Sequence, residues 1–379
     1  MHAARPLILV LLIGFATLGF GGAARATPQL LVDMRTAQVL FEQDAGVPWH
    51  PASLTKLMTA YVAFDAIRAG RVRLDTRVTL SQHAINQAPD KSGLPLGDSV
   101  SMQDALYIML VKSANDMAVA IAETIDGSDQ RYAEEMNTTA MRLGMTGTHY
   151  DNVNGLPDEG QVTTARDLAV LAIKIRSTFP QYDPIFSTQK VTIGKATLKT
   201  NNDLLTKFAG TTGMKTGFVC ASGLNIVATV ERGSQSLLAI VLGGSSARER
   251  NEMTAQMVLR GFSGEFGAGG GDVVGIANST VPPMNMQPQI CGKKARAYVA
   301  LRQKAYPMGL KGKPSFLNDK LSGIIYEATD LGPAVSPSPS DALGDGTPAA
   351  ESETGQPQAL AEPVVTVEAP LPMPRLDRG

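Results

Sequence analysis

The pattern of apolar and polar positions predicts a mixed α and β region in the first two thirds of the chain. Two short alternating runs, Gln29–Met34 and Gln38–Glu42, are separated by three residues and predict a β-hairpin. From about Ser53 to Ala69, apolar residues lie nearly all round the helical wheel. This distribution is typical of a helix that is buried on every side, so we expect a central helix here.

Further helices and strands follow in two blocks. A capping box at Ser101–Asp104 starts a helix that breaks at Lys112–Asn115 and then continues through Ile125. Other helices are expected at about residues 129–143, 165–176 and 246–260. Strand-like runs occupy Gly213–Cys220, Leu224–Glu231 and Leu237–Leu242. Strands at both ends with helices between them predict one α+β domain, over residues 27–262, whose two ends build a single sheet.

The first 26 residues are typical of a secretory signal peptide. Arg5 is followed by an uncharged, mostly apolar run of 14 residues, Leu7–Phe20, which is shorter than the roughly 20 residues that span a bilayer. Ala24-Arg25-Ala26 then offers a cleavage site between small residues. We therefore expect residues 1–26 to be removed on export, with an uncleaved N-terminal anchor as the alternative.

Beyond the predicted domain the sequence changes character twice. The stretch Gly261–Gly275 has seven glycines in 15 residues and is typical of a linker. Residues 263–332 show no convincing series of strands, so we expect a Gly-rich linker and a small appendage there. Residues 333–379 contain nine prolines and no aromatic residue. Such a segment cannot bury enough surface to offset its ordering entropy, so we expect a disordered, Pro-rich tail.

Composition and charge exclude some classes of protein. Hydrophobic residues make up 44% of the 379 residues and charged residues 18%, which excludes wholesale disorder. The formal net charge of −1 argues against a dedicated nucleic-acid binder. This average conceals a basic leader with two arginines and no acid, and a tail with seven acidic residues against two arginines. The region between them is therefore slightly basic.

The cysteines and histidines are few. Cys220 and Cys291 are the two cysteines, and in an exported protein they either form one disulfide or remain separate buried thiols. The three histidines after the predicted leader, His50, His83 and His149, have no metal-ligand spacing with each other or with the cysteines. We therefore expect neither a metal nor another cofactor.

A candidate nucleophile lies at the start of the predicted central helix. Without a G-x-S-x-G motif, a serine can still be activated by an unprotonated lysine within hydrogen-bond reach. Ser53 and Lys56, three residues apart on a helix, lie on one face, and burial would lower the pKa of the lysine. The ordinary explanation is an N-cap serine and a surface lysine. A second match, Ser187–Lys190, lies where a loop enters a strand, so its two side chains would not converge.

Two further motifs strengthen this interpretation. Ser113-Ala114-Asn115 lies at the predicted helix break, where a turn can point a hydroxyl and an amide into a cleft, although a capping turn would look the same. Lys215-Thr216-Gly217 lies on a predicted strand and offers a lysine, a hydroxyl and close backbone approach at the glycine. These groups suit a substrate carboxylate, although an edge strand with a solvated lysine is the ordinary explanation.

The three motifs in this order resemble those of the penicillin-recognising serine enzymes. The match is closer to the low-molecular-mass penicillin-binding proteins of peptidase family S11, the serine D-alanyl-D-alanine carboxypeptidases similar to penicillin-binding protein 5. The resemblance covers about residues 28–262 and rests on the strings Pro51–Ala60, Lys112–Asp116 and Gly213–Gly217. It implies a β-lactamase or penicillin-binding-protein transpeptidase-like fold, an antiparallel sheet flanked by helices with a helical subdomain.

The resemblance implies a role for each motif residue in removing the terminal D-alanine from peptidoglycan stem peptides. Ser53 would attack the scissile carbonyl to form an acyl-enzyme, and Lys56 would take its proton. Ser113 would relay a proton to the leaving D-alanine. Asn115 would hold the substrate amide, and β-lactam antibiotics would acylate the same serine.

The third motif would hold the substrate's terminal carboxylate. Lys215 and Thr216 would bind it, beside the backbone at Gly217. Arg250 resembles the family arginine that assists there, with Arg248 as the competing choice. The backbone N–H groups of Ser53 and Phe218 would form the oxyanion hole.

Several alternatives remain open at this level. A β-lactamase shares the motifs, but Tyr150–Gly155 offers no glutamate for its deacylation. A D,D-endopeptidase and a catalytically inactive wall-binding scaffold are the others. The C-terminal residues Leu371–Gly379 are broken by proline and do not predict the membrane-lying helix of other members. We expect an exported, periplasmic or cell-wall-associated enzyme without a clear membrane anchor after cleavage.

Overall fold

The computed structural model describes residues 27–267 and 270–332. The predicted signal peptide, residues 1–26, and the predicted tail, residues 333–379, lie outside the described residues. Within the described ranges, none of the helices has the length and apolar character that crossing a bilayer requires.

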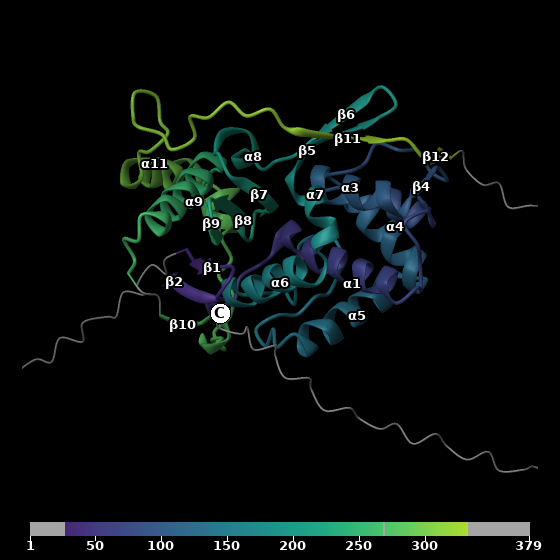
Figure 1. Cartoon of the computed structure of the whole chain (residues 1–379), viewed down its shortest axis with the longest axis horizontal. Coiled ribbons are helices and arrows are strands. Elements are labelled where there is room, and N and C mark those ends of the chain that lie inside the picture. Colours follow the sequence, from purple (N-terminus) through teal and green to yellow (C-terminus); the bar gives the residue numbers. More distant parts are fainter. Residues whose placement is uncertain (1–26, 268–269, 333–379) are drawn as a thin grey trace, which may run out of the picture. The chain divides into compact units, whose positions relative to one another are not determined.

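A six-stranded sheet, which we call the central sheet because helices cover both its faces, lies in the left half of Figure 1. Its strand order is β10-β2-β1-β9-β8-β7, and all neighbouring strands are antiparallel. The strands are β1 (Gln29–Asp33), β2 (Gln38–Gln43), β7 (Thr211–Val219), β8 (Gly223–Arg232), β9 (Gln235–Gly244) and β10 (Gly270–Asp272). The predicted hairpin is β1 and β2, and β1 pairs with β9. The prediction of one sheet built from both ends of the domain is thus confirmed.

Both faces of this sheet are buried. Successive side chains of a strand point to opposite faces, and on β9 this sends Leu238 and Ile240 to one hydrophobic core and Leu237 and Ala239 to another. Helix α6 (Ala165–Thr178) packs against β1 and β9, and α9 (Ala247–Phe262) packs against β8 and β9. The two helices cover opposite faces, which explains the uninterrupted apolar run Leu237–Leu242 of β9.

The remaining helices gather beside the sheet (Figure 1). Helix α1 (Lys56–Arg68) is buried over most of its length, as its sequence predicts, and contacts α3, α4, α5 and α6. The predicted N-cap at Ser101 is confirmed, since Ser101 Oγ accepts a hydrogen bond of 3.1 Å from the Asp104 N–H, whereas the Asp104 carboxylate accepts from the Tyr326 hydroxyl and the Asp330 N–H rather than closing a capping box. The other helices are α2 (Gln82–Ile85), α3 (Met102–Lys112), α4 (Asn115–Asp126), α5 (Asp129–Arg142), α7 (Asp183–Ser187), α8 (Leu204–Lys207), α10 (Gln287–Ile290) and α11 (Ala295–Ala305).

Residues 270–332 run along the domain and contribute a strand to each sheet. β10 joins the central sheet, β11 (Ile324–Ala328) pairs with β5 (Thr188–Ile193), and β12 (Leu331–Gly332) pairs with β4 (Ser99–Ser101). The small sheets are completed by β6 (Ala196–Lys199) and β3 (Arg77–Thr79). The expectation that this stretch lacks strands was wrong, because strands of two to five residues leave too short a pattern to recognise.

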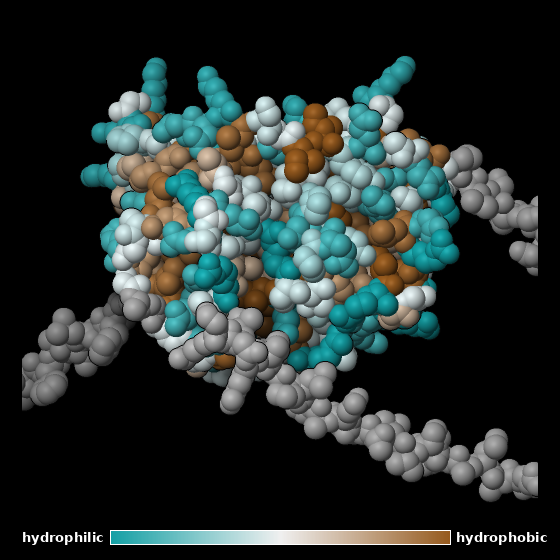
Figure 2. Space-filling view, viewed as in Figure 1, coloured by the Kyte–Doolittle hydropathy of each residue, from teal (hydrophilic) through white to brown (hydrophobic). Residues whose placement is uncertain are grey.

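The β11 strand is an exposed edge of its sheet. Figure 2 shows hydrophobic surface gathered at the top of this face, over the part of the molecule where Figure 1 draws β5 and β11. Ile324 and Ile325 of β11 are 50% and 53% exposed. On its other side β11 is fixed to the helices, since the Tyr326 hydroxyl donates a 2.6 Å hydrogen bond to Asp104 at the start of α3.

A disulfide joins Cys220, which follows β7, to Cys291, which follows α10, across 71 residues of sequence. The bridge ties the stretch after the central domain to the strand that carries the third motif. Closing a loop of this length stabilises a folded protein by about 4 kcal/mol in the chain-entropy model.

We predict that protein isolated from an oxidising compartment has no free thiol. Alkylation under denaturing conditions should leave the mass unchanged, and prior reduction should allow two alkyl groups to add. Reduction should also lower the free energy of unfolding by about 4 kcal/mol. Two alkylated thiols without reduction would contradict the bridge.

Candidate active site

The candidate nucleophile lies on a tight turn at the start of the central helix. Ser53 is in a 3₁₀ turn, Ala52–Thr55, and α1 begins at Lys56. The sequence predicts an α-helix from Ser53, whereas the observed turn has three residues per turn, so residues three apart are eclipsed. Ser53 Oγ and Lys56 Nζ are 3.0 Å apart, and the local fold therefore brings the two side chains directly together.

Lys56 is fully buried and surrounded by uncharged oxygens. Its Nζ lies 2.7 Å from Asn115 Oδ1 and 2.6 Å from the Asn154 carbonyl oxygen. A neutral amine has two N–H donors and one lone pair, so these two acceptors leave the lone pair for the Ser53 hydroxyl. Burial is the main cause that holds the pKa of Lys56 well below its usual value, and the charge of Lys215 lowers it further.

The second motif lies at the junction of α3 and α4. Ser113 ends α3 in the left-handed region, with φ 68° and ψ 30°, a conformation uncommon for residues other than glycine. Asn115 begins α4, and its backbone N–H donates a 2.8 Å hydrogen bond to the Asp90 carbonyl. The sharp change of direction at the predicted helix break brings the Ser113 hydroxyl to Lys215 and the Asn115 amide oxygen to Lys56.

The third motif faces the second from β7. Lys215 Nζ donates hydrogen bonds of 2.9 Å to Ser113 Oγ and to the Thr216 carbonyl. Lys215 is 3% exposed, and its burial lowers its pKa to about 7, while the charge of Asp90 opposes this shift. The site thus contains two serine–lysine pairs, Ser53 with Lys56 and Ser113 with Lys215.

A cavity of about 390 Å³ lies where the three motifs meet. Its lining includes Ser53, Ser113, Thr216, Gly217, Phe218 and Arg250. Arg250 lies in this lining, whereas the Arg248 guanidinium donates to the backbone carbonyls of Tyr306 and Met308. Of the two arginines that the sequence offers, Arg250 is therefore the one that the structure places at the cavity.

The basic groups at this cavity are Arg250 in its lining and Lys215, which is hydrogen-bonded to the lining residue Ser113. Asp90 and Asp203 also line it, but they form ion pairs with Lys112 at 3.0 Å and Lys207 at 3.2 Å. Over the described ranges, neither Lys215 nor Arg250 is in an ion pair with a carboxylate. Burial lowers the pKa of Arg250 to about 10, so the guanidinium is charged at neutral pH. The arrangement suits an anionic group of a substrate.

Glycine is required at two positions around the nucleophile. A Cβ on Gly217 would lie 2.9 Å from the Pro51 carbonyl oxygen and 3.1 Å from the Ser53 nitrogen, so β7 packs directly on the nucleophile turn. A Cβ on Gly155, which has φ +84°, would lie 1.9 Å from the Ala52 carbonyl oxygen. Phe218, by contrast, is 51% exposed at the rim.

The structure adds groups that the motifs do not indicate. Asn154 contributes a backbone carbonyl to Lys56, which leaves no signature in a side-chain pattern, and Gly155 is recognisable only once the turn it touches is known. Asp116, beside the second motif, accepts hydrogen bonds from the Ser92 N–H and hydroxyl. The discarded match, Ser187–Lys190, runs from the end of α7 into β5, in agreement with its sequence context.

The described part of the chain contains no group of three or more His, Cys, Asp or Glu side chains that could hold a metal. In the same residues, no carboxylate is hydrogen-bonded to Ser53 or Lys56. The chemistry available at Ser53 is therefore nucleophilic attack assisted by an amine. The fold and the site together define the class of serine acyl-transfer enzymes.

Comparison with known proteins identifies the family. A family model for D-alanyl-D-alanine carboxypeptidase, peptidase family S11, matches residues 21–246. The D-alanyl-D-alanine carboxypeptidase DacD of Escherichia coli is 36% identical over 238 residues, which are 61% of this chain and 61% of that protein. DacF of Bacillus subtilis is 28% identical over 282 residues, 68% of this chain and 71% of that protein. The chain thus spans about three fifths of the E. coli relative.

Comparison with solved structures identifies the same family. Penicillin-binding protein 6B of E. coli is similar with a TM-score of 0.59 and 35% identity, over 63% of this chain and 77% of that one. The chain belongs to the serine D-alanyl-D-alanine carboxypeptidases of family S11, the low-molecular-mass penicillin-binding proteins related to penicillin-binding protein 5. The predicted family and the α+β transpeptidase-like fold are confirmed.

We predict a pH dependence set by Lys215. A carboxylate interacts favourably with the charged form of a lysine, and with a pKa of about 7 the charged fraction of Lys215 in the free enzyme falls as the pH rises above that value. For a substrate with a C-terminal carboxylate, kcat/KM should therefore fall about tenfold per pH unit on the alkaline side. Because arginine stays charged, the variant Lys215→Arg should lose this alkaline limb. If kcat/KM of Lys215→Arg falls over the same alkaline pH range as in the wild type, Lys215 is not the cause of the fall.

Proposed function

We propose that this protein is a serine D-Ala-D-Ala carboxypeptidase that removes the terminal D-alanine from peptidoglycan stem peptides through an acyl-enzyme on Ser53. The observation that carries the proposal is the 3.0 Å contact between Ser53 Oγ and the buried Lys56 amine, whose other partners are uncharged. An amine in this setting can take the proton of the serine hydroxyl at neutral pH. The family membership supports the same activity.

Acylation begins when Ser53 Oγ attacks the carbonyl carbon of the penultimate D-alanine. The hydroxyl proton passes to Lys56 Nζ, and the carbonyl oxygen becomes an oxyanion near the backbone N–H groups of Ser53 and Phe218. When the tetrahedral intermediate collapses, the C–N bond breaks and the proton held by Lys56 passes through Ser113 to the leaving amine, which returns Lys56 to its neutral form. The product is an ester between Ser53 and the shortened peptide, together with free D-alanine.

Hydrolysis of the ester regenerates the enzyme. Water attacks the ester carbonyl, loses a proton to the neutral Lys56, and the second tetrahedral intermediate expels Ser53 Oγ, which recovers a proton. We assign this proton transfer to Lys56 because, among the described residues, it is the titratable side chain that is hydrogen-bonded to Ser53. A β-lactamase of the glutamate-dependent type is disfavoured because Lys56 has no carboxylate partner there.

Substrate binding uses the other two motifs. We assign the peptide amide to Asn115 and the terminal carboxylate to Lys215 together with Thr216 and Arg250, of which the last two line the 390 Å³ cavity. A penicillin carries a reactive amide carbonyl and a carboxylate and would acylate Ser53 in the same way. Penicillin-binding protein D2 of Listeria monocytogenes, which is 31% identical in sequence, is known in an ampicillin-bound form.

The cellular setting is part of the proposal. The family acts on the cell wall, and the leader at residues 1–26 is expected to direct export. We therefore place the enzyme in the periplasm or at the cell wall, where its substrates are peptidoglycan stem peptides.

The test is incubation with a pentapeptide ending in D-Ala-D-Ala, followed by mass analysis. The wild-type protein should remove one alanine, and Ser53→Ala should lower kcat/KM by more than about 10³-fold while the circular dichroism spectrum stays unchanged. The matched control is Ser187→Ala, the serine of the discarded motif, which should keep full activity. Labelling with a fluorescent penicillin should follow the same pattern.

Three outcomes would contradict the proposal. D-alanine release by Ser53→Ala would remove the serine from the mechanism, and cleavage of a cross-linked dimer without release of alanine would make the enzyme an endopeptidase. Binding of the peptide without any cleavage would leave the scaffold alternative.

A further inference from the structure

The helix α11 and the loop that follows it carry an exposed basic surface. From Val273 to Asn318 the sequence contains seven basic residues and no acidic one. Arg302 is in an ion pair, whereas the other six are exposed and, within residues 27–267 and 270–332, are in none. We call these six the basic face: Lys293, Lys294, Arg296, Lys304, Lys311 and Lys313. Figure 2 shows hydrophilic side chains projecting at the upper left of the molecule, where Figure 1 draws α11 and the loop after it.

The helix is oriented so that its basic side chains point outward. Tyr298 packs against the hydrophobic core, and Arg302 forms a 2.7 Å ion pair with Glu249 on α9. These two side chains are four residues apart and define the inner side of α11. Because the helix has 3.6 residues per turn, Arg296 and Lys304 lie on the opposite side. The basic residues of α11 therefore face away from the domain.

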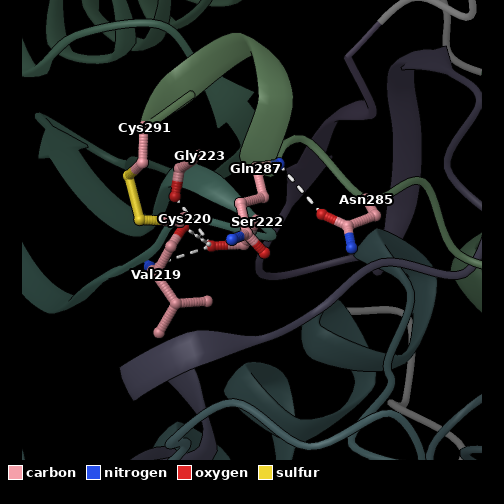
Figure 3. Close-up of a disulfide and its surroundings, with 7 residues drawn as sticks. All are labelled: Val219, Cys220, Ser222, Gly223, Asn285, Gln287 and Cys291. Atoms are coloured by element: carbon pink, nitrogen blue, oxygen red, sulfur yellow. Dashed lines mark hydrogen bonds between the residues drawn. A yellow bond between two sulfur atoms is a disulfide. The ribbon is translucent and has the colours of Figure 1, made fainter. Parts of the chain in front are cut away.

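Anchors at both ends fix this surface to the main domain. Before α11, the disulfide joins Cys291 to Cys220, which follows β7 (Figure 3). After α11, the Tyr306 hydroxyl donates a 3.0 Å hydrogen bond to the Gln256 side chain on α9. The basic face is therefore held at a fixed place on the folded domain.

The acidic side chains that contact this segment from α9 are used inside the fold. Glu249 and Glu252 are both buried. Glu249 is paired with Arg302, and Glu252 accepts a 2.8 Å hydrogen bond from the Phe316 N–H. Their carboxylates thus satisfy buried groups, and the positive charge of the outer surface stays available to a partner.

The basic face adjoins the carboxylate-binding end of the active site. Ala247 and Arg250, in the first turn of α9, line the 390 Å³ cavity. Arg248, between them, donates a 3.0 Å hydrogen bond to the carbonyl of Tyr306, the residue after α11. One turn of α9 therefore contacts the cavity on one side and the end of α11 on the other. A long anionic substrate that reaches the cavity can touch both.

We propose that the basic face binds carboxylates of a peptidoglycan strand and thereby selects polymeric substrate over free stem peptides. A strand presents one stem peptide after another, and in the proposed reaction each of them ends in a carboxylate. While one stem peptide occupies the cavity beside Ser53, carboxylates of its neighbours contact the basic face. The inference rests on the proposed carboxypeptidase activity and names the substrate class.

A polymer that carries carboxylates fits this surface better than a lipid surface does. Helices that lie on membranes combine basic residues with a broad apolar face. Among the described residues, α11 exposes one large apolar side chain, Leu301. The charges are instead spread from Lys293 to Lys313, which suits several separate anionic groups. Each exposed ion pair contributes little, so the affinity comes from making several contacts with one chain.

The first test compares D-alanine release from a free pentapeptide and from un-cross-linked peptidoglycan strands that carry the same pentapeptide. The variant Lys304→Gln/Lys311→Gln/Lys313→Gln should lower kcat/KM for the strands about three- to tenfold, because three exposed charge contacts are lost, and should change kcat/KM for the free peptide by less than about twofold. The advantage of the wild type on strands should shrink as salt is added.

The matched control removes three positive charges from other surfaces. Arg131 on α5, Lys174 on α6 and Lys195 between β5 and β6 are in no ion pair with another described residue. The variant Arg131→Gln/Lys174→Gln/Lys195→Gln has the same net charge as the test variant. It should keep the activity of the wild type on both substrates.

A second test measures binding without turnover. The Ser53→Ala protein should sediment with sacculi from which phosphate-containing polymers have been removed. It should sediment less with the same sacculi after their carboxylates have been converted to amides. Adding the three lysine substitutions to Ser53→Ala should also reduce the bound fraction. Vesicles of phosphatidylglycerol serve as the comparison for a lipid surface.

The outcomes separate this inference from the proposed function. Equal activity of the test variant and the wild type on strands would overturn the inference and leave the carboxypeptidase assignment standing. An equal loss on strands and free peptide would also overturn it, because the substitutions would then act on the active site. Sedimentation with vesicles but not with sacculi would overturn it in favour of a lipid partner. Failure to release D-alanine from either substrate would instead overturn the proposed function.

Discussion

The burial of one amine determines how the rest of this site is built. A charged ammonium group in a protein interior without a counter-ion is strongly disfavoured, and Lys56 has no carboxylate partner among the residues that the structure describes. Its neighbours Asn115 and Asn154 offer neutral oxygens instead. These oxygens accept the hydrogen bonds of the neutral Lys56 amine, so the fold itself holds a strong base next to the Ser53 hydroxyl. The buried helix α1 and the packing of β7 on its first turn maintain this environment.

The second lysine shows how similar groups acquire different tasks. Lys215 is also buried, and its pKa is lowered to about 7, while the charge of Asp90 opposes the lowering of the pKa of both lysines. Its amine is shared between the Ser113 hydroxyl and a backbone carbonyl. Near neutrality it is therefore poised between the charged and neutral forms, which suits a group that binds a carboxylate and stands beside a proton relay. Because each lysine's charge disfavours the other's, a charged Lys215 also helps to keep Lys56 neutral.

Much of this arrangement could be predicted from the sequence, and the exceptions have physical causes. The central helix, the helix break at Ser113 and the sheet built from both ends follow from apolar periodicity and capping residues. The 3₁₀ turn at Ser53 is not encoded by that periodicity. It depends on Gly217 and Gly155, which lie about 160 and 100 residues away in the sequence and allow the backbone to approach. Likewise, the backbone carbonyl of Asn154 has no signature in the pattern of side chains. Of the two arginines near the third motif, packing alone directs Arg248 to the Tyr306 loop and leaves Arg250 at the cavity.

Residues 270–332 lie beyond the family match, and their short strands are ordered by contacts with the main domain. Residues 270–332 have few buried apolar side chains of their own, so they cannot form an independent core. They gain order by fixing themselves to the main domain, through the disulfide to β7, through Arg302 with Glu249 on α9 at 2.7 Å, and through Tyr326 with Asp104 on α3. Each anchor falls on an element that also carries a site residue: Lys215 on β7, Arg250 on α9, and Ser113 at the end of α3. Residues 270–332 have little stability of their own and are thereby coupled to the geometry of the cleft. Because the Cys220–Cys291 disulfide is one of these anchors, its reduction weakens that coupling.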